Sequence, residues 1–261
     1  MLKEYISHSL IGTPLEPAAL AIRKVLNNLR QIQKPEMADT YIESERMRQV
    51  IDRVVEESTN CIDVGGHLGS ILQHIKERSP QGKHIGVEPV PYKAAWLAKK
   101  FPEMEILQIA LSDKPGEAEF FVQNSSAYSG LRLQGAGTQT VSTVKVACKR
   151  LDDIVPNDRE IGFIKLDAEG GELNVLGGGE ELVNRCRPVI MFTSVAHAIK
   201  AFDITQKDIY DTFVNKYGYS IYLFKDWLGN GQPLTLEGYV KAMEYPMQAF
   251  RFLAVPKENV K

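Results

Sequence analysis

The chain has 261 residues, of which 44% are hydrophobic and 25% charged, values typical of a folded globular protein that exclude disorder, a collagen-like repeat or a coiled coil. Its 31 Lys and Arg residues nearly balance 33 Asp and Glu residues, so the net charge of -2 gives no overall field to attract nucleic acid or anionic lipid. We therefore expect neither nucleic acid nor a membrane as a partner.

The cysteines and the hydropathy pattern predict a cytoplasmic protein. The three cysteines are far apart, odd in number and without the paired spacing of a zinc or redox site, which favours a reducing compartment. Residues 1–17 lack the basic and apolar segments of a secretory signal. Nowhere do about 18 apolar residues follow one another, as a membrane span requires.

Two amphipathic helices are predicted ahead of the main fold. Residues 16–33 carry apolar side chains at approximately helical spacing, and residues 43–57 repeat the pattern. We divide the chain into a helical extension, residues 1–40, and a Rossmann-like domain, residues 41–261. Because an amphipathic helix must bury its apolar stripe, the extension is expected either to cover the site or to mediate homo-oligomer formation.

In the rest of the chain, short apolar segments alternate with helical stretches, as in a doubly wound α/β fold. The predicted parallel strands are residues 61–64, 85–88, 106–111, 163–167 and 189–193. Before the fourth strand, residues 117–122 and 141–147 predict a β insertion around a polar loop. After a helix over residues 205–216, residues 220–224 and 250–255 are expected to complete a mostly parallel sheet with an antiparallel edge strand.

A glycine turn joins the first strand to the following helix. Asp63 stands two residues before the first glycine, whereas dinucleotide folds use G-x-G-x-x-G and need no acid there. Glycines permit a tight turn and the close approach of a ligand. An acid at this strand end suits a cationic ammonium better than a pyrophosphate. The residues predicted to bind a cofactor here are Asp63, Gly65, Gly66, His67, Leu68 and Gly69.

Two further strand ends point to an adenosine-bearing ligand. Glu88, followed by Pro89, ends the second strand, where an acid can accept the hydroxyl hydrogens of a ribose. The third strand ends in Ala110 and Leu111, placed to flank an adenine face, and Ser112, placed to contact its edge. An ordinary strand end explains these last three residues equally well.

Acidic residues at the end of the fourth strand are the candidates for catalysis. Asp167 and Glu169 alternate along an extended segment, so they share a face near the carboxyl end, where open sheets bind ligands. Such a pair can deprotonate a hydroxyl or hold a cation such as Mg²⁺. His197 is the rival base, since imidazole titrates near physiological pH. Lys165 is expected to pair with an acid, and Glu172 to stabilise a helix start.

These motifs resemble the FkbM-like methyltransferases, in which an Asp-x-Gly-x-x-x-Gly loop, an acid after strand two and an Ala-Leu-Ser-Asp turn hold S-adenosylmethionine. Lys-Leu-Asp-Ala-Glu-Gly-Gly-Glu, residues 165–172, looks like that family's Lys-x-Asp-x-Glu-Gly-x-Glu signature. The resemblance spans residues 60–192 and implies that Asp63, Gly65, Gly69, Glu88 and the turn at Ala110 bind this cofactor.

The sequence departs from the family pattern at two places. Gly66 and His67 stand where the family usually has Ala-Asn, so the contacts of these two positions do not transfer. The fifth strand often ends in Phe-Glu in the family, whereas Thr193 follows Phe192 here. No acid-base or metal-binding role of that Glu transfers to this chain.

The resemblance implies methyl transfer to an oxygen of a small-molecule acceptor, such as a sugar or natural-product hydroxyl. No Asn-Pro-Pro-Tyr or Asp-Pro-Pro-Tyr motif, as used for exocyclic amines of DNA, follows the fourth strand. Two alternatives stay open. The position of Asp63 disfavours a nicotinamide-dependent Rossmann oxidoreductase, and Thr193 gives some weight to a non-catalytic cofactor-binding module.

Overall fold

The computed structural model describes residues 13, 15, 18, 21, 22, 25–27, 33–123, 129–132 and 140–259. Most of the predicted helix over residues 16–33 lies outside the described residues, although those described at 18, 21, 22 and 25–27 are helical. Four apolar side chains within or directly before this helix are 50 to 63% exposed: Leu15, Ile22, Val25 and Leu26. The two roles expected of this extension therefore stay predictions.

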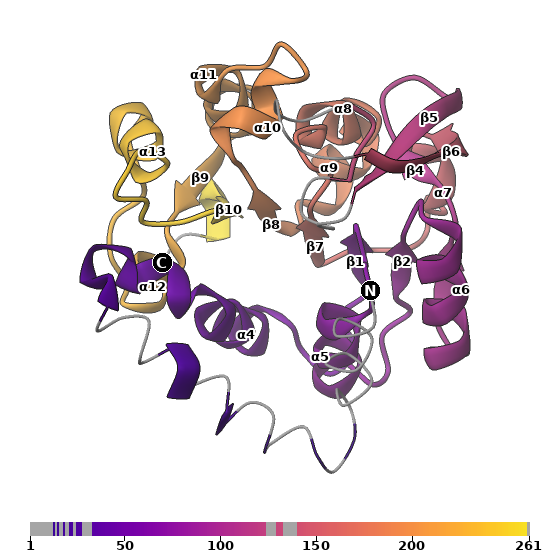
Figure 1. The fold of residues 1–261 in the computed structure, drawn as a ribbon, viewed down its shortest axis with the longest axis horizontal. Helices are drawn as coiled ribbons and strands as arrows, with labels where there is room; N and C mark the ends of the chain where they lie inside the picture. The colour runs from indigo at the N-terminus through magenta and orange to yellow at the C-terminus, as the bar shows by residue number, and fades with distance from the viewer. Residues whose placement is uncertain are drawn as a thin grey trace.

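A seven-stranded sheet forms the centre of the fold, in the order β3-β2-β1-β7-β8-β10-β9 (Figure 1). Its strands are β1 Cys61–Val64, β2 Ile85–Val87, β3 Glu105–Leu107, β7 Phe163–Leu166, β8 Val189–Thr193, β9 Tyr219–Tyr222 and β10 Arg251–Pro256. The first five pair in parallel, and β10 is antiparallel to both β8 and β9. The doubly wound, mostly parallel Rossmann-like sheet expected from the sequence is confirmed.

The antiparallel strand is β10, which is the second strand from the edge of the sheet. The sequence analysis placed the antiparallel strand at the edge itself. Helices connect β8 to β9, so β9 returns in the parallel direction at the edge of the sheet. The chain then turns back, and β10 enters between β8 and β9 with Leu253 beside both Met191 and Tyr222. The carboxyl end of β8 therefore lies beside the start of β10.

Helices cover both faces of the sheet (Figure 1). On one face lie α4 Glu43–Val54, α5 Ser70–Arg78 and α12 Phe224–Leu228. On the other lie α8 Glu172–Gly177, α9 Glu180–Cys186, α10 Ala196–Lys200, α11 Gln206–Asp211 and α13 Leu236–Ala242. The remaining described helices are η1 Pro35–Met37, α3 Ala38–Tyr41, α6 Pro91–Lys100, α7 Leu151–Ile154, η3 Thr212–Lys216 and η4 Lys257–Asn259.

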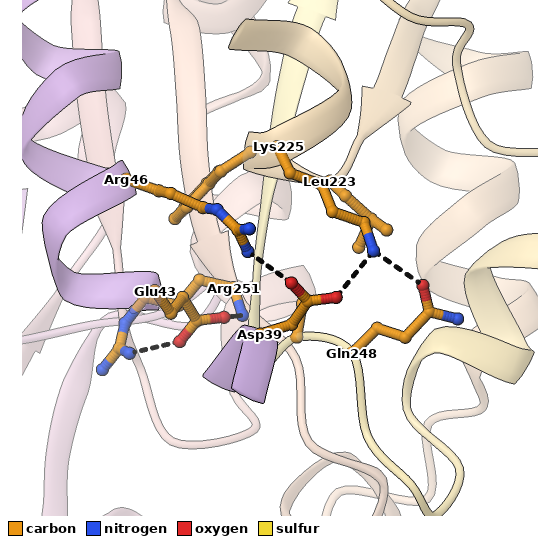
Figure 2. Close-up of a pocket in the computed structure, with 9 residues that line it drawn as sticks. Asp39, Glu43, Arg46, Leu223, Lys225, Gln248 and Arg251 are labelled. Carbon is orange, nitrogen blue, oxygen red and sulfur yellow. Dashed lines mark hydrogen bonds and ion pairs between the residues drawn. The ribbon is translucent and has the colours of Figure 1, made fainter. Parts of the chain in front are cut away.

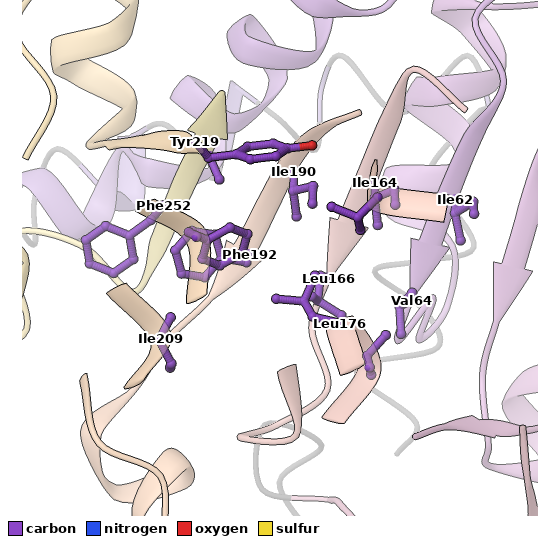
Figure 3. Packing of buried hydrophobic residues seen from close by; sticks show 14 of the residues in the cluster. Ile62, Val64, Ile164, Leu166, Leu176, Ile190, Phe192, Ile209, Tyr219 and Phe252 are labelled. Atoms are coloured by element: carbon purple, nitrogen blue, oxygen red, sulfur yellow. The ribbon is translucent and has the colours of Figure 1, made fainter. Parts of the chain in front are cut away.

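The alternation of side chains along each strand divides the core into two layers. Ile62 and Val64 pack with Leu176 and Phe192 on the α8 side, as Figure 3 shows. The alternate residues of β1, Cys61 and Asp63, point to the α4 side, where Cys61 joins the other apolar cluster. Because successive residues of a strand face opposite ways, Asp63 and its register partners on the adjacent strands, Gly86 and Lys165, belong to the α4 face.

The predicted β insertion is confirmed as a second sheet, in the order β4-β6-β5. It contains β4 Ala110–Leu111, β5 Gly116–Gln123 and β6 Thr140–Lys149. The prediction of one continuous strand over residues 106–111 is wrong, because Ala110 leaves the main sheet and pairs with Cys148 of β6. A separate apolar cluster that includes Val90, Ala110 and Cys148 draws this segment away from β2.

The later predictions hold with shifted boundaries. The helix expected over residues 205–216 starts at a capping box, in which Thr205 Oγ1 accepts from Asp208 N, and continues as the π-helix η3. The strand expected over residues 220–224 ends at Tyr222, since Phe224 begins α12. The helix expected over residues 43–57 ends at Val54.

Candidate cofactor and acceptor site

The carboxyl ends of β1, β2 and β7 meet at the predicted glycine turn. Gly65 N and Gly66 N both donate to the carbonyl oxygen of Val87, at 2.9 and 3.0 Å. Gly69 N donates to the Gly66 oxygen at 2.8 Å, and Gly69 then caps α5. The turn is thus tied to the end of β2 before the helix begins, and buried Leu68 anchors it to the core.

The glycines at both ends of the turn make room for the protein's own atoms. Gly65 has a φ of +75°, and a Cβ there would lie 2.3 Å from the carbonyl oxygen of Asp167. Gly69 has a φ of +85°, and a Cβ there would lie 2.5 Å from the ring of Phe101. The sequence predicts that these glycines let a ligand approach, but the atoms that lie where a side chain would be are those of Asp167 and Phe101.

Glu88 holds the glycine turn and the following segment together. Its carboxylate accepts a hydrogen bond from His67 N at 2.8 Å and another from Val90 N at 2.9 Å. The side chain is 4% exposed, and burial raises its pKa, while nearby Lys93 and the two N–H donors oppose that rise. A carboxylate oxygen can accept more than one hydrogen bond, so these two N–H donors do not prevent Glu88 from accepting from a diol.

Lys165 is a buried cation between the ends of β1 and β7. Its Nζ lies 3.1 Å from Asp63 Oδ1 and 3.8 Å from Asp167 Oδ2. The same ammonium donates to the carbonyl oxygens of Val64 and Gly65, at 3.0 and 2.7 Å. Burial disfavours the charge, but the two acids raise the pKa of Lys165 above its usual value. The expectation that Lys165 pairs with an acid is confirmed.

The segment after β7 concentrates carboxyl groups. Glu172 is 1% exposed, and its Oε1 accepts from Ala168 N at 2.9 Å and Gly170 N at 3.3 Å. Burial and the charge of Asp167 raise the pKa of Glu169 to about 9 and that of Glu172 to about 7. Glu169 therefore holds a proton at neutral pH.

Arg251 and Glu43 are two site residues that the sequence analysis missed. Arg251 of β10 pairs with Thr193 of β8. Thr193 directly follows Phe192, which pairs with Leu166 of β7. The Nη1 of Arg251 lies 2.9 Å from Glu43 Oε2, and Glu43 Oε1 accepts from the backbone N–H groups of residues 250 and 251. These partners are 208 positions apart, and the only sequence signal was a charge at the start of an apolar strand.

The other predicted site residues are spread over a wider area. Ala110 and Leu111 are buried in β4, and Ser112 Oγ donates to Asp113. Ala110 shares a cluster with Val90, which keeps this strand end close to the Glu88 segment. His197 lies exposed on α10, whose Ala198 carbonyl oxygen closely approaches Gly170.

A pocket lined by charged and apolar residues lies where α3 and α4 meet the segments around β9 and β10 (Figure 2). Asp39 joins Arg46 at 2.9 Å and Lys225 at 2.7 Å, and Lys225 also donates to Gln248. Arg251 lines the same pocket and pairs with Thr193 of β8. The pocket therefore lies beside the carboxyl end of β8. Within the described ranges, no group of three or more His, Cys, Asp or Glu side chains could hold a metal ion.

The chain was also compared with known proteins. A model of the methyltransferase FkbM domain matches residues 63–221. The 2-O-methyltransferase NoeI of Sinorhizobium fredii (strain NBRC 101917 / NGR234) is 23% identical over an alignment of 165 residues that covers 54% of this chain and 65% of that protein. The chain thus spans less than two thirds of this curated relative.

Two solved structures are similar at low identity. Methyltransferase FkbM from Methylobacillus flagellatus KT aligns with a TM-score of 0.47 and 15% identity, covering 76% of this chain and 44% of that chain. The plantazolicin methyltransferase BpumL in complex with SAH aligns with a TM-score of 0.45 and 10% identity, covering 98% of this chain and 96% of that chain.

Proposed function

The chain belongs to the FkbM methyltransferase family, and we propose that it transfers a methyl group from S-adenosylmethionine to a hydroxyl oxygen of a small molecule. The choice of an oxygen as the methyl acceptor is supported by the curated relative NoeI, which is a 2-O-methyltransferase. The cofactor would occupy the ends of β1 and β2, and the acceptor the ends of β7 and β8. Open α/β sheets bind ligands at this edge.

Unpartnered carboxylate oxygens are the observation that carries the proposal. Asp63 Oδ2 and Asp167 Oδ1 are buried and have no hydrogen-bond partner among the described residues. A buried carboxylate oxygen without a donor is costly, and native proteins rarely leave one so. Lys165 occupies only the Oδ1 side of Asp63. The ammonium of the cofactor's methionine part would supply the donor that Asp63 lacks.

Glu88 fits the ribose of the same cofactor. Its two backbone hydrogen bonds fix the orientation of the carboxylate before any ligand arrives. A fixed acceptor loses little entropy on binding a diol. Ala110 belongs to the same apolar cluster as Val90, which suits an adenine position between β2 and β4. Pro89, which follows Glu88 and is buried, is proposed to lie beside the cofactor as well.

The acids after β7 suit removal of the acceptor's proton. The bound cofactor supplies an electrophilic methyl group on a sulfonium. The acceptor oxygen would form a bond to that methyl carbon as the carbon–sulfur bond breaks, and the hydroxyl proton would pass to a carboxylate. Burial and the charge of Asp167 raise the pKa of Glu169 to about 9, so Glu169 is protonated at neutral pH and we assign the role of base to Asp167. Most of the rate would come from positioning the two reactants.

Labelled methyl transfer tests the proposed reaction. The purified protein is incubated with methyl-labelled S-adenosylmethionine and a panel of sugars and hydroxylated natural products, and the products are analysed by mass spectrometry. We expect label on an oxygen of a panel compound, and less label with the Asp63→Asn variant when the cofactor is below saturation. Binding of the cofactor without transfer to any compound would favour a non-catalytic module, and binding of NADH instead would favour an oxidoreductase.

A further inference from the structure

The pocket of Figure 2 contains more hydrogen-bond donors than its own acids can use. Asp39 directs one oxygen to Arg46 and the other to Lys225. Glu43 directs one oxygen to two backbone N–H groups and the other to Arg251. Both carboxylates are therefore occupied by partners inside the protein.

The cations are not used up in the same way. A guanidinium has five N–H donors, and within the described part of the chain Arg46 and Arg251 each direct one guanidinium nitrogen to a pocket acid. Gln248 accepts from Lys225 through Oε1, which leaves its amide N–H₂ group available. Three cations and two carboxylates also give these charged groups a net charge of +1. The pocket therefore has hydrogen-bond donors that its own acids do not use, and its charged side chains carry a net positive charge.

We propose that this pocket binds an oxyanion, namely a phosphate, sulfate or carboxylate group carried by the methyl acceptor. Arginine forks match the planar or tetrahedral oxygens of such groups. Arg251 connects the pocket to the acceptor side, because it lies beside Thr193 in the register row that follows Leu166 of β7. An acceptor anchored here by its anionic end would extend along that row toward Asp167.

The identification of the oxyanion's carrier as the methyl acceptor rests on the proposed function. Binding of an oxyanion can itself be tested without turnover. Inorganic phosphate is titrated into the full chain by calorimetry at constant ionic strength, with acetate as a second oxyanion and glycerol as a neutral probe. We expect binding of phosphate or acetate at one site, and none of glycerol. Arg46→Gln and Lys225→Gln should each weaken the oxyanion about tenfold or more, as the loss of a charge-assisted hydrogen bond does.

Two further variants separate binding from folding. Gln248→Leu leaves both ion pairs of Asp39 in place and should weaken phosphate about two- to tenfold. Lys216→Gln removes the same charge and one surface ion pair, with Glu180, and should leave phosphate affinity unchanged. No oxyanion binding by the wild type, or equal affinity in Arg46→Gln, Lys225→Gln, Gln248→Leu and Lys216→Gln, overturns the proposal.

Titration of SAH into the same samples keeps the two proposals apart. A wild-type protein that binds SAH but neither oxyanion would leave the proposed function standing and remove the oxyanion site. A protein that binds phosphate through Arg46 and Lys225 but does not bind SAH would keep the oxyanion site and remove the methyltransferase assignment. Normal circular dichroism and SAH affinity in Gln248→Leu would confirm that the variant is folded.

Discussion

The ammonium of Lys165 lies 3.1 Å from the carboxylate of Asp63, and this contact joins the ends of two neighbouring strands beneath the glycine turn. The same ammonium donates to the carbonyl oxygens of residues 64 and 65. It therefore fixes the turn and neutralises part of the acidic charge at once. The cofactor end of the site depends on a lysine that is not itself expected to touch the cofactor.

Lys165→Met should destabilise the protein by about 3 to 5 kcal/mol, the usual result of removing one partner of a buried ion pair. The change leaves Asp63 facing Asp167 without the cation between them. Urea unfolding followed by circular dichroism measures the loss. Lys216→Met, which removes an exposed lysine from an ion pair with Glu180, should cost less than about 1 kcal/mol. Equal effects of the two changes would contradict the role of Lys165.

Gly69→Ala should destabilise the chain more than Gly116→Ala does. Both glycines have positive φ, so either alanine is strained. At Gly69 the new Cβ would also lie 2.5 Å from the ring of Phe101, whereas at Gly116 nothing lies within 4 Å. The midpoints of thermal unfolding give the comparison. A Gly69→Ala variant as stable as Gly116→Ala would mean that α6 moves aside at no cost.

Stability should fall as the pH rises from about 5 toward 9, and Glu169 should account for part of the fall. Burial and the charge of Asp167 raise the pKa of Glu169 from 4.5 to about 9. A carboxyl whose pKa is raised on folding favours the folded state fully below its unfolded value, and this contribution is lost as pH rises through the folded value. Glu169→Gln should therefore have a flatter dependence of unfolding temperature on pH. An identical slope in the wild type and the variant would refute the assignment.

Asp167→Asn should lower turnover by about 10²- to 10⁴-fold, the usual contribution of a placed base. Affinity for the cofactor should change little, unless Asp167 also holds the methionine ammonium. His197→Ala is the comparison, since His197 lies exposed on α10. We expect His197→Ala to retain most of the turnover. The base would be on the wrong element if Asp167→Asn were fully active and His197→Ala inactive.

The sequence predicted where Asp63 and Glu88 lie in the sheet, but it did not predict the ion pair between Glu43 and Arg251. Asp63 and Glu88 follow strands whose apolar runs are continuous, so their places at the sheet edge could be predicted from spacing alone. The pairing of Glu43 with Arg251 joins residues 208 positions apart and depends on how α4 crosses the sheet. No local pattern contains that information. The departure of Ala110 from the main sheet likewise depends on a cluster with Val90 and Cys148.

Calorimetric titration of S-adenosylmethionine or SAH into the purified chain tests the central claim most directly. The wild type should bind with one site. Asp63→Ala and Glu88→Ala should each weaken binding by about 1 to 3 kcal/mol, because each removes a charge-assisted hydrogen bond, and both variants should keep a normal circular dichroism spectrum. No binding by the wild type, or wild-type affinity in both folded variants, would contradict the assignment of this site.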